Sequence, residues 1–191
     1  NKQKLSNILK DDHDYQKASS ILLNSIKNNE NICILGDYDV DGACATSLLV
    51  RYFIHINQKH YFYIPDRVTD GYGASKKLFQ KLILKKPKLV IMVDCGSTSN
   101  EAIDYLNKHN IKSIIIDHHE INKPYPKSDV IINPKKEFTK NENSLLCATA
   151  LTYFFIEIII QKTKSDFKIY NFLIYVLLAT VCDVMPLRKI N

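Results

Sequence analysis

The sequence predicts an α/β fold in which a doubly wound sheet of five parallel strands is followed by trailing helices. Short apolar segments alternate along the chain with helical segments of about 10 to 15 residues, which is the pattern of repeated strand–helix–strand units. The apolar segments show no polar alternation, as expected for strands that helices cover on both faces. Apolar residues make up 46% and charged residues 24% of the 191 residues, which is ordinary for a globular domain.

Each predicted element follows from its local pattern. Helices carry apolar residues three and four positions apart, whereas strands are short apolar runs that end at turn-forming residues such as Gly36 and Pro65. Helices are expected at residues 14–29, 43–56, 74–84, 100–109, 145–161 and 169–179, and strands at 31–35, 61–64, 89–93, 113–116 and 130–132. Residues 1–134 then form the domain core, and residues 135–191 a polar connection (135–143) and the helices that complete the domain.

The composition narrows the class of protein. No stretch of about 18 uncharged apolar residues is present, so no membrane span is expected. The net charge of +6 permits a polyanionic partner but does not establish one. Five cysteines without a Cys-x-x-Cys pair disfavour a zinc knot or a disulfide framework and favour the reducing cytoplasm. The chain begins without Met or a signal peptide, and we expect it to be part of a longer protein.

The strongest feature is the acidic segment at residues 36–42, Gly-Asp-Tyr-Asp-Val-Asp-Gly, between the first strand and a helix. Alternate residues of an extended segment point the same way, so Asp37, Asp39 and Asp41 are expected to share one side. Three carboxylates that close repel one another unless a cation lies between them. A divalent metal is the obvious candidate. A solvated acidic loop is the alternative, and an EF-hand is disfavoured because no Glu follows at the required spacing.

Two further clusters follow predicted strands. Asp94 comes after the third strand, and Asp117-His118-His119 after the fourth. Because carboxyl-terminal strand ends gather along one edge of a parallel sheet, these groups are expected to converge with the acidic segment. Taken alone, Asp94 would more often be a helix cap, and a His pair a surface or core feature. The adjacent imidazoles are expected to point to different sides, one toward a metal and the other toward phosphate or a second metal.

The kinds of ligand atom expected at this edge indicate which metal would bind there. Carboxylates with imidazole suit Mn²⁺ or Mg²⁺ better than a structural zinc. Two such ions about 4 Å apart can activate a water and neutralise a phosphoryl transition state, and phosphate esters hydrolyse extremely slowly without such help. The sequence therefore predicts a phosphoesterase with two Mn²⁺ or Mg²⁺ ions. Removing Asp39, Asp41 or Asp94 relieves repulsion, so each loss is expected to leave the apo fold intact or slightly more stable.

Six segments carry a family resemblance. They are residues 35–42 (Leu-Gly-Asp-Tyr-Asp-Val-Asp-Gly), 64–67 (Ile-Pro-Asp-Arg) with 70–73 (Asp-Gly-Tyr-Gly), 93–97 (Val-Asp-Cys-Gly-Ser), 116–119 (Ile-Asp-His-His), 132–134 (Ile-Asn-Pro) and 179–187 (Ala-Thr-Val-Cys-Asp-Val-Met-Pro-Leu). In these segments the chain resembles the DHH phosphoesterase superfamily. Within that superfamily, residues 70–73 and 133–134 make it similar to the RecJ exonucleases. Cys95 and Ala150 depart from the usual Asn and Gly, and mild effects on hydrogen bonding and helix packing are expected.

The resemblance implies a strand order of 2-1-3-4-5 and a role for each candidate residue. The implied metal ligands are Asp39, Asp41, Asp94, His118 and Asp183. The implied catalytic residues, which complete the shell or touch the phosphate, are Asp37, Asp117 and His119. Arg67 would contact the nucleic-acid backbone, where its fork of donors suits phosphate. Without the resemblance, Asp183 is no more than a turn residue at the end of an apolar helix.

The implied function is hydrolysis of phosphodiester bonds in single-stranded DNA by a 5′→3′ exonuclease of DNA repair and recombination, with a helicase or a single-strand-binding protein as candidate partners. Two alternatives stay open. A small-substrate DHH hydrolase (an oligoribonuclease, cyclic-dinucleotide phosphodiesterase or pyrophosphatase) is disfavoured by residues 70–73, and a non-catalytic DNA-binding scaffold by the filled ligand positions. Family members continue into a second substrate-binding domain, so the chain is expected to stop before one.

Overall fold

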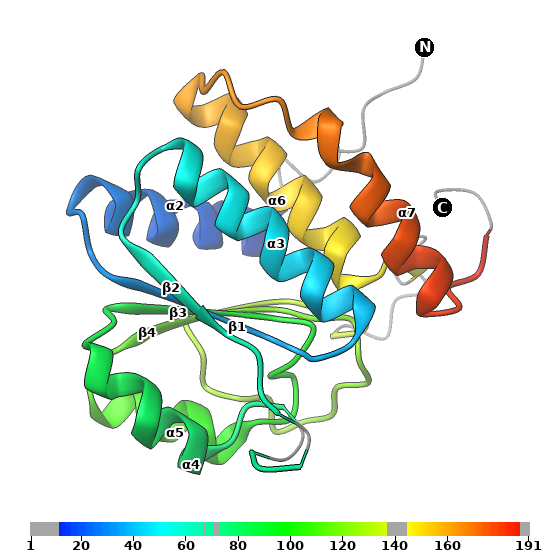
Figure 1. Ribbon diagram of the computed structural model, residues 1–191. Helices are drawn as coiled ribbons and strands as arrows, with labels where there is room; N and C mark the ends of the chain where they lie inside the picture. Colours follow the sequence, from blue (N-terminus) through cyan, green and yellow to red (C-terminus); the bar gives the residue numbers. More distant parts are fainter. Residues whose placement is uncertain (1–11, 67, 71–72, 137–144, 188–191) are drawn as a thin grey trace.

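The computed structural model describes residues 12–66, 68–70, 73–136 and 145–187. Its centre is a five-stranded parallel sheet in the order β2-β1-β3-β4-β5, which confirms the predicted fold class and strand order (Figure 1). The strands are β1 (Ile32–Gly36), β2 (His60–Tyr63), β3 (Leu89–Val93), β4 (Lys112–Ile116) and β5 (Val130–Ile132). Residues of β1, β3 and β4 are almost all fully buried, which explains why these segments are apolar without alternation.

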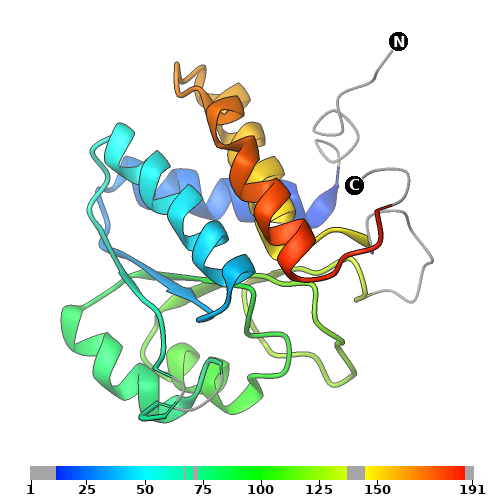
Figure 2. The same ribbon diagram turned by 45° about the vertical axis from the view of Figure 1, so that its right-hand side comes forward.

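Helices cover both faces of the sheet (Figures 1 and 2). The helices are α2 (His13–Lys27), α3 (Val40–His55), α4 (Lys76–Leu82), α5 (Asn100–Lys108), α6 (Ala148–Thr163) and α7 (Leu173–Cys182), with 3-10 turns at Ile83–Lys85 and Ile169–Phe172. α2, α3 and α6 pack on one face and α4 and α5 on the other, so two hydrophobic clusters are separated by the sheet. α7 packs on the outside of α3 and α6.

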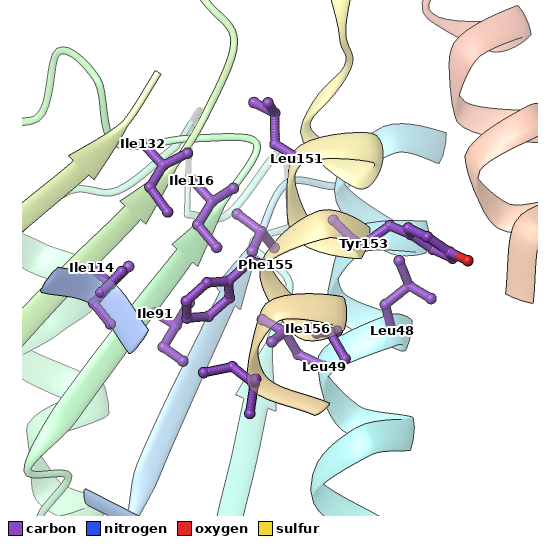
Figure 3. Packing of buried hydrophobic residues seen from close by; sticks show 14 of the residues in the cluster. Leu48, Leu49, Ile91, Ile114, Ile116, Ile132, Leu151, Tyr153, Phe155 and Ile156 are labelled. Atoms are coloured by element: carbon purple, nitrogen blue, oxygen red, sulfur yellow. The ribbon is translucent and has the colours of Figure 1, made fainter. Parts of the chain in front are cut away.

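The centre of the larger cluster is α6, whose apolar residues face both the sheet and α3. Phe155 lies over Ile91 and Ile114 of the sheet, and Ile156 lies beside Leu49 of α3 (Figure 3). Phe155 and Ile156 are fully buried. A helix that is apolar on most of its circumference is expected in such a central position, and its place in the molecule is therefore set by the core.

Several predicted boundaries shift by a few residues, each for a local reason. The helix predicted at 74–84 begins later, because the Ser75 side chain accepts a hydrogen bond from the Leu78 N–H and so caps α4. Its end tightens into the 3-10 turn Ile83–Lys85. The helix predicted at 169–179 divides in the same way into the 3-10 turn Ile169–Phe172 and α7.

Within the described parts of the chain, no helix combines the length and the apolar character needed to cross a membrane. Most of the polar connection predicted at residues 135–143 lies outside the described residues, and so does Arg67.

Candidate metal centre

The sheet register brings four strand ends into one row. Gly36 of β1 pairs with Val93 of β3, Val93 pairs with Ile116 of β4, and Ile116 pairs with Ile132 of β5. The residues that follow these four positions are Asp37, Asp94, Asp117 and Asn133. All four are buried, with 7% exposure or less. Parallel pairing in register therefore gathers three carboxylates and an amide at the carboxyl edge of the sheet.

The acidic segment does not stay extended, so the alternation given as the reason for its three carboxylates sharing one side is wrong. β1 ends at Gly36 and α3 begins at Val40, because Asp39 caps the helix by accepting a hydrogen bond from the Gly42 N–H at 2.9 Å. Asp41 is therefore a residue of the first helical turn. Asp37 and Asp41 are buried, whereas Asp39 is exposed.

Gly42 permits this tight turn from strand to helix. A Cβ at this position would lie 2.6 Å from both the main-chain nitrogen and the main-chain oxygen of Asp37. Any side chain would force the first turn of α3 away from the end of β1. The glycine thus keeps Asp41 of the helix close to Asp37 of the strand end.

Asp94 is the buried carboxylate of the site that lacks hydrogen-bond donors. It is fully buried, and neither carboxylate oxygen accepts a hydrogen bond from a described residue. Burial, and then the charges of Asp41 and Asp39, raise the pKa of Asp94 to about 10. Its backbone adopts a left-handed conformation with φ of 60°, which Asp tolerates better than most residues. A cation beside Asp94 would remove the cost of its buried charge.

Asp117 is equally buried but has many donors. Its Oδ1 accepts hydrogen bonds from the main-chain N–H of His118 (2.8 Å) and of His119 (3.1 Å) and from Nδ1 of the His119 ring (2.8 Å). Its Oδ2 accepts one from the Ser97 N–H (3.0 Å). Burial opposes ionisation, but the hydrogen bonds from His119 and Ser97 outweigh it and lower the pKa of Asp117 to about 2.

The two imidazoles lie on the same side, and the expectation that they point to different sides is wrong. Their ring centroids are 4.8 Å apart, and both rings reach Oδ1 of Asp94, from His118 Nε2 at 3.3 Å and from His119 Nδ1 at 3.7 Å. Neither ring nitrogen of the buried His118 has a hydrogen-bond partner among the described residues. His119 is partly exposed, and its hydrogen bond with Asp117 raises the pKa of its imidazole.

Asp183, at the C-terminal end of α7, lies beside His118. The helix ends there because Val184 takes a left-handed conformation (φ 52°) and the Met185 N–H bonds back to the Thr180 oxygen at 3.0 Å, as in a helix-terminating turn. The Asp183 carboxylate lies 3.3 Å from Nε2 of His118. Burial raises the pKa of Asp183, although the His118 charge opposes the shift.

Three groups of side chains could each hold a metal ion, with ligand atoms all within 4.8 Å of one another. They are Asp37 with Asp39 and Asp94, Asp41 with His118 and Asp183, and Asp94 with His118 and His119. The first two groups share no residue. The residues fit a divalent cation, because the buried oxygens of Asp94 have no hydrogen-bond partner among the described residues. One of them lies 3.3 Å from Nε2 of the buried His118, which also lacks a partner there, and carboxylate with imidazole is a suitable ligand set.

Other residues support the site, and the residue patterns alone did not indicate them. Asn133, at the end of β5, donates hydrogen bonds from its amide to the Ser97 hydroxyl (2.8 Å) and to the His119 main-chain oxygen (2.9 Å). Thr149 of α6 donates to the main-chain oxygen of Asp41 at 2.9 Å. An apolar strand end followed by Asn could have indicated Asn133, whereas nothing in the spacing indicates Thr149.

Comparison with known proteins identifies the family of this chain. A model described as the DHH family, N-terminal domain, matches residues 31–180. The single-stranded-DNA-specific exonuclease RecJ of Escherichia coli K12 is 27% identical over 187 residues, which cover 92% of this chain and 32% of that protein. The Bacillus subtilis protein of the same name is 26% identical over 176 residues, covering 92% of this chain and 22% of that one. The chain thus spans about a third or less of the length of these relatives.

A crystal structure of exonuclease RecJ bound to manganese superimposes with a TM-score of 0.83 at 22% identity, covering 91% of this chain and 44% of that one. The likeness confirms the fold of the chain.

Proposed function

The chain belongs to the DHH family, and from that premise we propose that it is the metal-dependent catalytic domain of a single-strand-specific DNA exonuclease. The observation that carries the proposal is the pairing of Asp94 with His118. Both are buried, their polar atoms are 3.3 Å apart, and none of these atoms has a hydrogen-bond donor or acceptor of good geometry among the described residues. A protein leaves such groups unsatisfied where a ligand completes them.

We assign the residues as follows. Asp39, Asp41, Asp94, His118 and Asp183 would hold Mn²⁺ or Mg²⁺, and two ions are proposed because two of the candidate groups share no residue. Bound there, the ions would lower the pKa of a water and offset the charge that develops on the phosphoryl oxygens.

The remaining polar residues would bind and orient the phosphate. Asp117 Oδ1 accepts a hydrogen bond from Nδ1 of His119 and so fixes the orientation of the imidazole, which is proposed to contact a phosphate oxygen. Because Asp117 raises the pKa of that imidazole, His119 retains its positive charge to higher pH than a free histidine. Asp37 would complete the shell, and Arg67 is proposed to contact the backbone of the substrate.

The wider context is also a proposal. The relatives are named for single-stranded DNA, and we propose that substrate here, degraded in the 5′→3′ direction in DNA repair and recombination, with a helicase or a single-strand-binding protein as partner. The cytoplasm is proposed because all five cysteines are free thiols.

The test is release of mononucleotides from a single-stranded oligonucleotide in Mn²⁺, with blunt duplex and a dinucleotide as parallel substrates and with each oligonucleotide end blocked in turn. We expect cleavage of the single strand that a block at the 5′ end stops. Binding should weaken steeply with salt, because cationic side chains displace counterions from the phosphates. Activity confined to the dinucleotide would assign the chain to the small-substrate branch, and failure to bind Mn²⁺ to the non-catalytic scaffolds.

A further inference from the structure

Asp41 differs from the other proposed ligands because a helix far away in the sequence, α6, donates hydrogen bonds to its carboxylate. Its Oδ2 accepts a hydrogen bond from the Ala148 N–H at 2.7 Å, and its Oδ1 accepts one from the Thr149 N–H at 2.7 Å. The Thr149 hydroxyl donates to the main-chain oxygen of Asp41 at 2.9 Å. The first turn of α6 therefore holds both the side chain and the backbone of Asp41.

These hydrogen bonds satisfy N–H groups at the N-terminus of α6. The first N–H groups of a helix lack partners within it, and here the side chain of the capping residue, Cys147, accepts no hydrogen bond from them. Asp41, more than a hundred residues earlier in the chain, takes the place of the missing cap. Its negative charge also lies at the positive end of the helix dipole. The carboxylate thus has hydrogen-bond donors without any metal, which sets it apart from Asp94.

The contact between α6 and Asp41 is fixed in place because α6 is the central helix of the core. Thr149 itself is fully buried, and further along the helix Phe155 and Ile156 are fixed against the sheet and α3 (Figure 3). On its other side, Asp41 Oδ2 lies 3.6 Å from His118 Nε2. One carboxylate therefore joins the core helix to the candidate metal centre.

We propose that Thr149 is a positioning residue of the metal centre, whose hydroxyl and N–H orient Asp41 toward the ion beside His118 and Asp183. The proposal rests on the proposed role of Asp41 as a metal ligand. It also changes an expectation, because removing Asp41 takes away the cap of α6 as well as a repulsive charge. Asp41→Ala should destabilise the apo protein, where repulsion alone predicts the opposite.

The chain supplies a matched control in Thr152, one turn further along α6. Thr152 is also fully buried, but its hydroxyl has no hydrogen-bond partner among the described residues. Replacement by Val removes a hydroxyl from each position while keeping nearly the same shape. The difference between the two variants therefore isolates the hydrogen bond to Asp41.

The experiment is calorimetric titration of the metal-free chain with Mn²⁺ for wild type, Thr149→Val, Thr149→Ser and Thr152→Val. Groups that orient a metal ligand typically change affinity by about 10- to 100-fold, and we expect Thr149→Val to bind Mn²⁺ about tenfold more weakly. Thr149→Ser restores the hydroxyl and should restore most of the affinity. Thr152→Val should bind Mn²⁺ like the wild type. A role of Thr149 in packing alone would lower the melting temperature and leave the affinity of folded protein unchanged.

Two failures are distinguishable. If the wild type binds no Mn²⁺, the proposed function fails. If the wild type binds Mn²⁺ and Thr149→Val binds it equally well, or Thr149→Ser does not recover the affinity, the positioning role is overturned and the metal site stands.

If Thr149→Val does not fold, a second measurement on the wild type tests the proposal. In the wild type, saturation with Mg²⁺ should slow hydrogen exchange at the Ala148 and Thr149 amides more than at amides of α5, on the opposite face of the sheet. Equal slowing in both helices would overturn the coupling.

Discussion

Asp94 and Asp117 occupy equivalent places and have opposite environments. Each follows the last residue of its strand, β3 or β4, and the two strand ends are paired in register. Both side chains are buried to about the same degree. Yet the pKa of Asp94 is raised to about 10, whereas that of Asp117 is lowered to about 2. Because burial is shared, the neighbours cause the difference. Asp117 accepts four hydrogen bonds, whereas Asp94 accepts none from the described residues and lies near the charges of Asp41 and Asp39.

The two neighbouring acids therefore have different roles. Asp117 is a satisfied anion that fixes the loop carrying His118 and the ring of His119. Asp94 is an unsatisfied acid whose charge becomes favourable only when a cation arrives. Burial alone, which is shared, therefore does not distinguish Asp94 from Asp117. The missing donors do.

The largest expected effect is on Asp94. Asp94→Asn should lower Mn²⁺-dependent hydrolysis by about a thousandfold or more, which is about 4 kcal/mol of barrier. The metal-free variant should be more stable than the wild type by about 1–3 kcal/mol, because no buried carboxyl has to be neutralised on folding. Asn also accepts the left-handed backbone at this position. Steady-state rates and urea denaturation measure the two effects, and retained activity would remove Asp94 from the metal site.

Asp117→Asn should change stability in the other direction. The amide cannot accept all four hydrogen bonds, and the His119 imidazole loses its counter-charge. A hydrogen bond to a charged group contributes about 1.5–3 kcal/mol, so we expect the free energy of unfolding of the metal-free protein to fall by about 2–3 kcal/mol. Urea denaturation of the two Asn variants side by side gives the comparison. Equal shifts of the same sign would show that the two acids are equivalent after all.

The pH dependence of stability should carry opposite contributions from the two acids. Asp117 has a folded pKa below its unfolded value of about 4, so its contribution is present above that pH and is lost as pH falls toward 2. Asp94 has a folded pKa above its unfolded value. The unfolded state then binds fewer protons, and stability falls as pH rises from about 4 toward 10.

Denaturation of the metal-free proteins between pH 3 and pH 9 checks these signs. The stability advantage of Asp94→Asn over the wild type should grow as the pH rises. The disadvantage of Asp117→Asn should shrink by about 1 kcal/mol as the pH falls to 3. Parallel curves for all three proteins would contradict the assignment of opposite environments.

Much of this arrangement could be predicted from the sequence, because strand ends of a parallel sheet must converge. That rule placed Asp94 beside Asp117 and the two histidines without knowledge of any contact. The alternation predicted for the acidic segment was wrong, because that prediction assumed that residues 36–42 stay extended between the strand and the helix. The cap formed by Asp39 starts a helix instead. Local cap chemistry decided the geometry there.

The donors could not be predicted, since they come from residues distant in sequence. Nothing in the sequence around Asp41 indicates that α6 would bind it, and spacing could not tell Asp94 from Asp117. Asp183 was indicated only by family resemblance, because one acid at the end of an apolar helix has no distinctive pattern. Hydrogen-bond partners across a fold depend on the packing of whole helices, which a local pattern does not encode.

The smallest expected effect concerns Asn133, which supports Asp117 indirectly. Its amide bonds the Ser97 hydroxyl and the His119 main chain, on the two loops that hold the Asp117 carboxylate. Asn133→Ala removes these two bonds and also the one that its amide oxygen accepts from the Lys135 N–H. It should lower the free energy of unfolding by about 1 kcal/mol. Asn107→Ala is the control, because its amide makes a similar bond to a main-chain oxygen at an exposed site and its loss should cost less.

Asn133→Ala should leave Mn²⁺ affinity within about threefold of wild type. Asn133 is outside all three candidate ligand groups, and its contact with a member of one of them is to the main-chain oxygen of His119, not to the imidazole. Urea denaturation measures the first effect and calorimetric titration with Mn²⁺ the second. If stability falls and affinity holds, the hydrogen-bonded region around Asp117 is energetically separable from the cation site at Asp94. If the variant loses Mn²⁺ binding altogether, the two regions are one unit, and the division of tasks between the two neighbouring acids fails.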